Sequence, residues 1–502
     1  MRKTMKTYGF LLTPALIGIL VGATPVYAQQ PNVLFIAVDD MNDAVSVIDS
    51  TLKAVTPNID RLASAGISFN NAHAAGTYCA PCRAAIFTGQ YASTTGIYKY
   101  QVYHALYPEL VPLQFSFHKA GYETYGAGKL YHHQDGYIDQ RGWTEFFLRT
   151  QRQRESGWPL DSWSEEMPMP SQGQKEQSNS GAYTKKGMRK WGVLPNNKEA
   201  EMADTLRTEW VVSKLKEKRD KPFFLALGLY APHIPNYCPK KYYDLYDRDN
   251  LSMPAKKADD LDDLPEPMRT KMKTREKSFK RNYEDSHLLP EAIHSYLASI
   301  SYADAMIGRV LDALKASPYA DNTIVVLWGD NGYHYGEKGH FGKKELWQRT
   351  SNIPFVWAGP GVAKGKKLDV TVSLIDMYPT FVEMCALPQP PQELEGVSLA
   401  TTLKNPGQAK DREVYLPYTE PKGYAIINQT WRYIHYPDDT EELYNVRHDH
   451  NEWNNLAENP EYTSAKKILR AKAPKTFAAP APSQSVKRDL VIEGESYHWE
   501  VK

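Results

Sequence analysis

Three short apolar runs constrain the fold of this chain more than any other feature of its sequence. They cover residues 32–38, 222–228 and 323–328, and each is almost free of polar side chains. Strands that are apolar throughout are typical of parallel sheets covered by helices on both faces, whereas a half-exposed sheet alternates polar and apolar residues. The runs therefore predict an α/β fold around a large, mixed but mostly parallel sheet sandwiched by helices.

Polar groups follow each of these runs. Asp39 and Asp40 come directly after the first, His233 lies in a proline-flanked loop after the second, and Asp330 and Asn331 follow the third. The carboxyl ends of parallel strands meet at one edge of a sheet, where open α/β sheets bind ligands. Adjacent carboxylates repel each other unless a cation or basic groups lie between them. A solvated turn would explain any one of these groups, but the three together predict a site.

Other patterns divide the chain into two parts. Residues 290–316 have the clearest amphipathic helical spacing, whereas residues 424–436 and 442–446 alternate like an antiparallel hairpin. We therefore expect a large domain over residues 29–418. A smaller C-terminal α+β subdomain with an antiparallel sheet would cover residues 419–502.

Four segments carry weaker patterns. We expect residues 414–416 to be a late strand of the large domain and the proline- and alanine-rich residues 474–484 to be an exposed, extended tail. The polar residues 150–200 indicate a long insertion over the active face. Residues 251–285 are highly charged, which predicts a solvated loop region with short helices.

A thiol lies at the start of a predicted helix that ends at Gly89. Pro81 suits the first turn, so Cys79 lies at the helix N-terminus, where free amides favour an anion. Arg83 adds a fixed positive charge with forked donors. This pattern indicates a nucleophile in an anion-binding cradle. Two alternatives remain open at this point: a Cys79–Cys82 redox pair, and small residues that only pack under a helix.

The sequence Cys79-x-Pro81-x-Arg83, followed by Thr88-Gly89, resembles the signature of type I sulfatases, in which a maturation enzyme oxidises the first cysteine to formylglycine. The fourth residue of that signature is usually serine and is Cys82 here. Gly128-Lys129-x-x-His132 matches the family, and Pro232-His233-x-Pro235 is similar to the iduronate-2-sulfatase branch. The resemblance covers nearly the whole mature chain. It implies an alkaline-phosphatase-like fold.

The resemblance also implies which residues act. The implied catalytic set is Cys79, Arg83, Lys129, His132, His233 and Lys343, and the implied metal ligands are Asp39, Asp40, the converted Cys79, Asp330 and Asn331. Ligation by oxygen alone fits Ca²⁺ best, with Mg²⁺ as the second choice. Zinc is not expected, because this set contains no histidine and no thiolate once Cys79 is converted.

A mechanism follows from this resemblance. One hydroxyl of the aldehyde hydrate at position 79 attacks sulfur, while His233, with Lys343, protonates or stabilises the departing sugar oxygen. His132 then removes a proton from the other hydroxyl, sulfate leaves and the aldehyde returns. Arg83 and Lys129 help to neutralise the sulfate oxygens.

The motifs favour sulfated, uronate-containing or related polysaccharide fragments as substrates. Three alternatives belong to other classes of activity. They are phosphonate or phosphate ester hydrolysis in the same superfamily, thiol-disulfide exchange at Cys79–Cys82, and carbohydrate binding without catalysis.

The first 28 residues have a basic start, an apolar run and a small-residue cleavage site after Ala28. They predict a secretory signal peptide and a periplasmic or secreted protein without a membrane anchor. The formal net charge of +1 gives no support to nucleic-acid binding. The four cysteines are too few to indicate a disulfide framework.

Overall fold

The structure is a computed structural model that describes residues 30–48, 52–132, 138–147 and 190–482, and the strands 488–493 and 496–501. The predicted signal peptide and most of the predicted insertion at 150–200 lie outside these ranges. Within them, no helix is both long enough and apolar enough to cross a bilayer.

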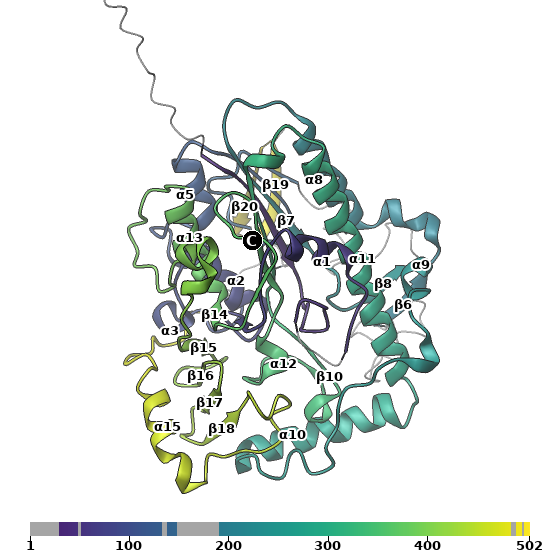
Figure 1. Cartoon of the computed structure of the whole chain (residues 1–502), viewed down its shortest axis with the longest axis vertical. Coiled ribbons are helices and arrows are strands. Elements are labelled where there is room, and N and C mark those ends of the chain that lie inside the picture. The colour runs from purple at the N-terminus through teal and green to yellow at the C-terminus, as the bar shows by residue number, and fades with distance from the viewer. Residues whose placement is uncertain are drawn as a thin grey trace, which may run out of the picture.

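Within the described residues, a sheet of eight strands forms the centre of the molecule (Figure 1). The strand order is β13 (Lys366–Leu368), β2 (Gly66–Phe69), β12 (Phe355–Ala358), β9 (Thr323–Gly329), β1 (Asn32–Val38), β7 (Phe223–Leu229), β4 (Glu123–Gly128) and β5 (Glu145–Phe147). Strand β12 runs antiparallel to both of its neighbours, and the other neighbouring strands are parallel. The prediction of a mixed, mostly parallel sheet is confirmed.

Helices cover both faces of this sheet, which explains why its central strands are apolar throughout. Leu34 and Ile36 of β1 belong to one core cluster, and Val33 and Phe35 belong to the other. The first face carries α1 (Pro57–Ser64), α8 (Ala203–Lys216) and α11 (Leu289–Lys315), and the second carries α2 (Cys79–Thr88), α5 (Leu113–Lys119) and α13 (Met377–Met384) (Figure 1). All seven residues of β1 are buried.

The register of the central strands brings their ends to one edge. Val38 of β1 is paired with Leu229 of β7 on one side and with Gly329 of β9 on the other. Gly128 of β4 is level with Gly228 of β7. The residues that follow these four strands therefore meet at the same edge of the sheet, as the sequence predicts.

Short elements connect these layers. The strands are β3 (Ala72–His73), which pairs with β14 (Val372–Ser373), β6 (Trp191–Leu194), which pairs with β8 (Asn236–Pro239), and β10 (His334–Tyr335), which pairs with β11 (Phe341–Gly342). The helices are α3 (Ala92–Thr95), α4 (Tyr103–Leu106), α9 (Lys240–Tyr243), α12 (Gln348–Ser351) and α14 (Ala400–Lys404). Short 3₁₀ segments cover Asn196–Glu201, Arg248–Asn250, Ala320–Asn322, Glu337–Gly339, Leu374–Asp376, Pro406–Gln408 and Pro460–Tyr462.

An antiparallel sheet forms the predicted C-terminal part, together with α15 (Thr463–Arg470). Its strands lie in the order β15 (Val414–Pro417), β16 (Tyr424–Ile427), β17 (Trp431–His435) and β18 (Glu441–Asn445). The hairpin predicted at residues 424–446 is confirmed. The strand predicted at residues 414–416 is confirmed, but it pairs with β16 and completes the small sheet, so it is not a strand of the central sheet.

The segment 251–285 is more regular than its composition predicts. It contains α10 (Glu266–Phe279), which continues as one turn of π-helix over Lys280–Glu284. A narrow stripe of Met268, Met272 and Phe279 is buried, and the two methionines pack against the small sheet. The predicted loop region occurs over residues 251–265, but the helix that follows is longer than expected, because its contact with the small sheet stabilises it.

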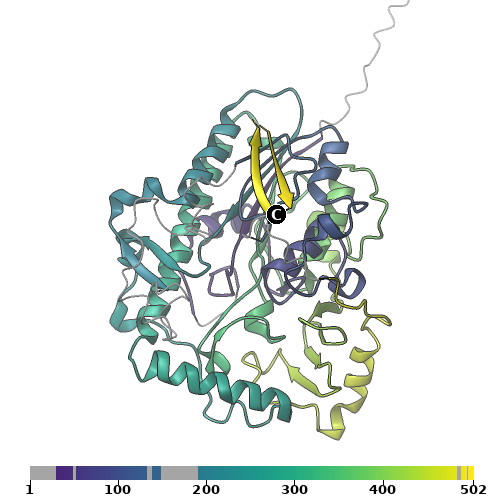
Figure 2. The same cartoon turned by 180° about the vertical axis from the view of Figure 1, so that it is seen from behind.

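The predicted C-terminal tail is also packed, not exposed throughout. The backbone N–H groups of Ala478 and Ala481 donate to the carbonyl oxygens of Ser93 and Gly96, and Ala481 is buried. A hairpin of β19 (Arg488–Glu493) and β20 (Ser496–Val501) follows and ends the yellow segment of Figure 2. The contacts with α3 and its following turn hold the segment that leads into this hairpin.

Candidate active site

Helix α2 positions the thiol. Cys79 is its first residue, all ten of its residues are buried, and Gly89 ends it with a left-handed φ of 72°. The structure thus confirms that Cys79 lies at a helix N-terminus. Burial raises the pKa of the Cys79 thiol, although Lys343 opposes that shift. The unconverted side chain is therefore a protonated thiol at neutral pH, which is a weak nucleophile.

Three buried carboxylates surround this helix end. Asp39, Asp40 and Asp330 are at most 2% exposed, and the Asp40 backbone N–H donates to Asp330 Oδ1 at 3.0 Å. Asp40 has a φ of 57°, an uncommon conformation for a residue other than glycine. Ligand atoms of Asp39, Cys79 and Asp330 all lie within 4.8 Å of one another.

Cations hold these carboxylates in place. Arg83 Nε donates to Asp330 Oδ2 at 2.7 Å, and its Nη2 lies 3.5 Å from Asp39 Oδ1. Lys129 pairs with Asp39, and Lys343 pairs with Asp40. The Lys343 ammonium also lies 3.8 Å from the Cys79 sulfur. Among these six paired groups, three positive charges balance three negative charges.

Asn331 supplies the observation that fits a metal ion. Its Nδ2 donates to Asp40 Oδ1 at 2.7 Å and to the Gly332 carbonyl at 3.0 Å. Its Oδ1 is buried and has no hydrogen-bond partner among the described residues. An unsatisfied amide oxygen beside three carboxylates is costly without a cation. Because these donors are hard oxygens, the residues fit Ca²⁺, or Mg²⁺ with retained waters.

Local charges shift the carboxylates in opposite directions. Burial would raise the pKa of Asp40, but Lys343, followed by His233, holds it below the ordinary value. Burial raises the pKa of Asp330, although Arg83 opposes this shift. A divalent cation beside these groups would favour the ionised form of both.

Two histidines face this edge. The Nδ1–H of His233 donates to the Ile234 carbonyl at 2.6 Å, and its Nε2 lies 3.7 Å from Asp40 Oδ2. Burial, aided by Lys129, lowers the pKa of His233 to about 3. His132 is buried with its ring 5.1 Å from that of Tyr100, and burial lowers its pKa well below the usual value. Both rings are neutral in the protein without a bound anion.

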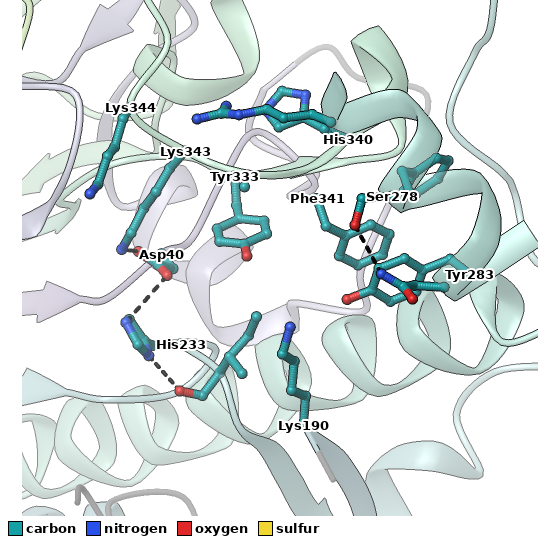
Figure 3. Close-up of a pocket in the computed structure, with 15 residues that line it drawn as sticks. Asp40, Lys190, His233, Ser278, Tyr283, Tyr333, His340, Phe341, Lys343 and Lys344 are labelled. Carbon is teal, nitrogen blue, oxygen red and sulfur yellow. Dashed lines mark hydrogen bonds and ion pairs between the residues drawn. The ribbon is translucent and has the colours of Figure 1, made fainter. Parts of the chain in front are cut away.

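The residues expected from the sequence thus all meet at one edge of the sheet. The sequence analysis did not identify the residues on the opposite side of the neighbouring cavity. A cavity of about 460 Å³ opens beside the edge and is lined by Asp40, His233 and Lys343 on one side (Figure 3). The other side carries Lys190, Arg275, Phe279, Tyr283 and Phe341. We call these two sets the inner wall and the outer wall. Predicting a regular helix over residues 266–279 from the sequence would have located part of the outer wall.

The geometry argues against a redox pair. The four cysteines of the chain all lie in described segments, and none forms a disulfide. Burial raises the pKa of both Cys79 and Cys82, and Cys82 is fully buried. Disulfide-exchange proteins need an accessible cysteine with a lowered pKa.

Comparisons with known proteins identify the family of this chain. The family model described as "Sulfatase" matches residues 31–385, and that described as "N-sulphoglucosamine sulphohydrolase, C-terminal" matches residues 336–477. A sulfatase from Formosa agariphila is 37% identical over 460 residues, which cover 90% of this chain and 87% of the relative. Iduronate 2-sulfatase from Mus musculus is 28% identical over 404 residues, which cover 72% and 70%.

A solved structure shares the fold. It shows a protein in complex with its substrate D-glucosamine-2-N,6-O-disulfate, with a TM-score of 0.66 and 21% identity. The match covers 88% of this chain and 96% of the other. With the family model spanning well over half of its length, the chain belongs to the sulfatase family and is a sulfuric ester hydrolase of the alkaline-phosphatase-like fold.

Proposed function

We propose that this protein hydrolyses sulfate esters of carbohydrates, through a formylglycine that a maturation enzyme makes from Cys79. The position of Cys79 carries this proposal. Its side chain lies at a helix N-terminus, within 4.8 Å of ligand atoms of Asp39 and Asp330 and 3.8 Å from the Lys343 ammonium. As a buried, protonated thiol it is poorly suited to attack sulfur.

Two groups that this chain would acquire complete the chemistry. Formylglycine would supply, as its hydrate, an oxygen nucleophile whose product can break down again to the aldehyde. Ca²⁺, held by Asp39, Asp40, Asp330, Asn331 and the converted residue 79, would supply charge that polarises the sulfate oxygens. The three cations and three carboxylates at this edge of the sheet balance one another, so a bound Ca²⁺ would leave a net charge of +2. This charge suits an anionic sulfate ester.

The chain's own residues would divide the remaining work. Arg83, Lys129 and Lys343 already point charged donors at the edge, so they would bind and neutralise the sulfate oxygens. His233 Nε2 faces the same space while its Nδ1–H is fixed to a carbonyl, so it can hold a proton for the leaving oxygen. A bound anion would raise the low pKa of His233, because it adds negative charge beside the ring. His132 would accept a proton in the second step.

The substrate proposal is a sulfated, uronate-containing or related polysaccharide fragment. It is supported by the similarity to iduronate 2-sulfatase and to a protein whose substrate is a glucosamine disulfate. The predicted signal peptide supports action in the periplasm or outside the cell. Residues 1–28 lie outside the described part, so this location is proposed from the sequence.

The test is sulfate release by protein coexpressed with a maturation enzyme. We expect the peptide that contains Cys79 to carry an aldehyde in place of the thiol. We also expect release from sulfated uronate oligosaccharides, faster than from 4-nitrophenyl sulfate. The Cys79→Ala variant is the control and should release none. Release of only phosphonate or phosphate, or an unconverted thiol in protein that reduces insulin, would refute the proposal.

A further inference from the structure

The cavity beside the catalytic edge is large enough for more than a sulfate group. Its volume of about 460 Å³ falls within the range of roughly 300–1,000 Å³ that is typical of small-molecule sites. The inner wall, formed by Asp40, His233 and Lys343, belongs to the catalytic edge. The outer wall comes from α10, the π-turn, β11 and the residue before β6. Figure 3 shows Tyr283 and Phe341 on the opposite side of the cavity from Asp40 and His233.

Three of the five residues of the outer wall are aromatic. Phe341 stacks on Tyr283 with ring centroids 4.1 Å apart and an interplanar angle of 5°, and it also stacks on Phe279 at 5.6 Å. Phe341 is partly exposed, and it lines the cavity together with Tyr333. A flat apolar surface beside polar groups suits the apolar face of a sugar ring.

Two lysines line the cavity without an acidic partner. Of the four cations there, Lys343 pairs with Asp40 and Arg275 pairs with Glu345. Among the described residues, no carboxylate lies within ion-pair distance of the ammonium groups of Lys190 or Lys344. Burial lowers the pKa of both side chains, and Lys343 contributes to the shift at Lys344.

Of these two lysines, Lys190 gives the stronger evidence for a bound anion, because its side chain points into the cavity. Figure 3 shows its side chain pointing into the space between His233 and Tyr283. The Lys344 ammonium instead lies over the rings of Tyr78 and Tyr100, at 4.9 and 5.6 Å. Lys190 is partly buried. Moving a cation partly out of water without a counter-ion is unfavourable, so this position favours an anion that binds there.

We infer, on the basis of the proposed function, that the outer wall binds the sugar next to the one that loses its sulfate, and that this neighbour carries a second anionic group paired with Lys190. The anionic group is a carboxylate or a second sulfate. The inner wall holds the ester that is hydrolysed. The stacked rings of Phe341 and Tyr283 support the neighbouring ring, and Lys344, which also lines the cavity, adds positive charge.

The test uses binding, so that it does not depend on turnover. Three disaccharides share the sulfated sugar that the matured protein hydrolyses and differ in the neighbour, which is glucose, glucuronate or glucose 6-sulfate. Their affinities for the Cys79→Ala protein are measured by calorimetry with Ca²⁺ present. We expect one or both charged neighbours to bind about tenfold more tightly than glucose. The preferred one identifies the anionic group.

Variants assign this preference to the outer wall. Lys190→Met should remove the difference between the charged and neutral neighbours, and Lys190→Arg should keep most of it. Lys240→Met is the matched control, because Lys240 is exposed on α9 and pairs with Asp244. Equal affinities for all three disaccharides, or an unchanged preference in Lys190→Met, would overturn the inference while sulfate release by the matured protein stands. Absence of sulfate release would instead refute the proposed function.

Discussion

The inner and outer walls of one cavity are built in different ways. Two residues of the inner wall, Asp40 and His233, follow buried strands of the central sheet, and Lys343 follows the short strand β11 and pairs with Asp40. The outer wall comes from a helix with few apolar residues, and it carries Lys190, which has no acidic partner among the described residues. If the proposed function is right, we expect the inner wall to determine the reaction and the outer wall to determine which sulfated sugar is accepted.

The largest expected effect comes from removing the inner-wall histidine. His233→Ala should lower kcat of the matured protein by about 10²–10⁴-fold, the usual contribution of general acid catalysis. The loss should be larger for a sugar sulfate than for 4-nitrophenyl sulfate, because a sugar alkoxide needs a proton to leave and 4-nitrophenolate needs little help. Steady-state kinetics on 4-nitrophenyl sulfate and on an oligosaccharide measures this. The role is wrong if kcat is unchanged on both substrates.

His233 is a cleaner target than Arg83. The Arg83 side chain is 1% exposed and contacts Asp39 and Asp330, so Arg83→Ala leaves buried carboxylates unpaired. Breaking a buried pair in this way costs about 3–5 kcal/mol. A loss of activity in Arg83→Ala therefore mixes catalysis with folding. The His233 side chain is 19% exposed, and we expect the melting temperature of His233→Ala to stay near that of the parent protein.

Metal removal tests the inner edge as a whole. Chelation with EGTA should abolish most sulfate release, and added Ca²⁺ should restore it. At 100 times its dissociation constant, bound Ca²⁺ should stabilise the fold by about 2.7 kcal/mol, which a thermal melt detects. Asn331→Ala should reduce the stabilisation that a given Ca²⁺ concentration produces, because this variant lacks the Oδ1 atom that has no protein partner among the described residues.

A second buried cluster makes the metal test sharper. His334, His340 and Glu345 also bring ligand atoms within 4.8 Å of one another. Glu345 is already paired with Arg275 and lies 3.1 Å from His340 Nε2, and these nitrogen donors would favour Zn²⁺. We expect Zn²⁺ not to restore activity after chelation. If Zn²⁺ restored activity and Ca²⁺ did not, the metal required for activity would be assigned to this cluster.

The outer wall should respond in KM, not in kcat. Phe341→Leu keeps apolar volume but removes the ring that stacks on Tyr283. Aromatic contacts of this kind are worth about 0.5–1.5 kcal/mol, so KM for an oligosaccharide should rise about 2–13-fold. The value of kcat should change little, as expected for uniform binding. An equal fall in kcat would show that both walls act in the chemical step.

The sequence predicted the two walls unequally, and the reason is physical. Asp39 and Asp330 follow apolar runs that are typical of a buried parallel sheet, so their meeting point follows from strand topology. Lys190 reaches the cavity because β6 pairs with β8, which lies close to His233 in the chain. Neither short strand has a pattern that specifies this partner. Helix α10 likewise depends on packing against the small sheet, which its own composition does not show.

A buried histidine outside both walls should affect only the pH dependence of stability, and this is the smallest effect that we predict. His73 is fully buried, its Nε2 lies 2.8 Å from Asn71 Oδ1, and burial, aided by Arg432, lowers its pKa well below 6.5. The folded state therefore binds fewer protons at this site than the unfolded state. Its contribution is complete above about pH 6.5 and is lost as the pH falls toward the folded-state value.

Replacing this histidine should flatten the pH dependence of stability without changing catalysis. In His73→Gln, the free energy of unfolding should fall less steeply below pH 6.5, by up to about 1.4 kcal/mol per pH unit. Urea unfolding at a series of pH values measures this slope, and the exposed His448→Gln is the control. Because His73 lies outside the cavity, the pH profile of kcat should stay that of the parent protein. A shift in that profile would mean that acid unfolding, and not His233 or His132, shapes it.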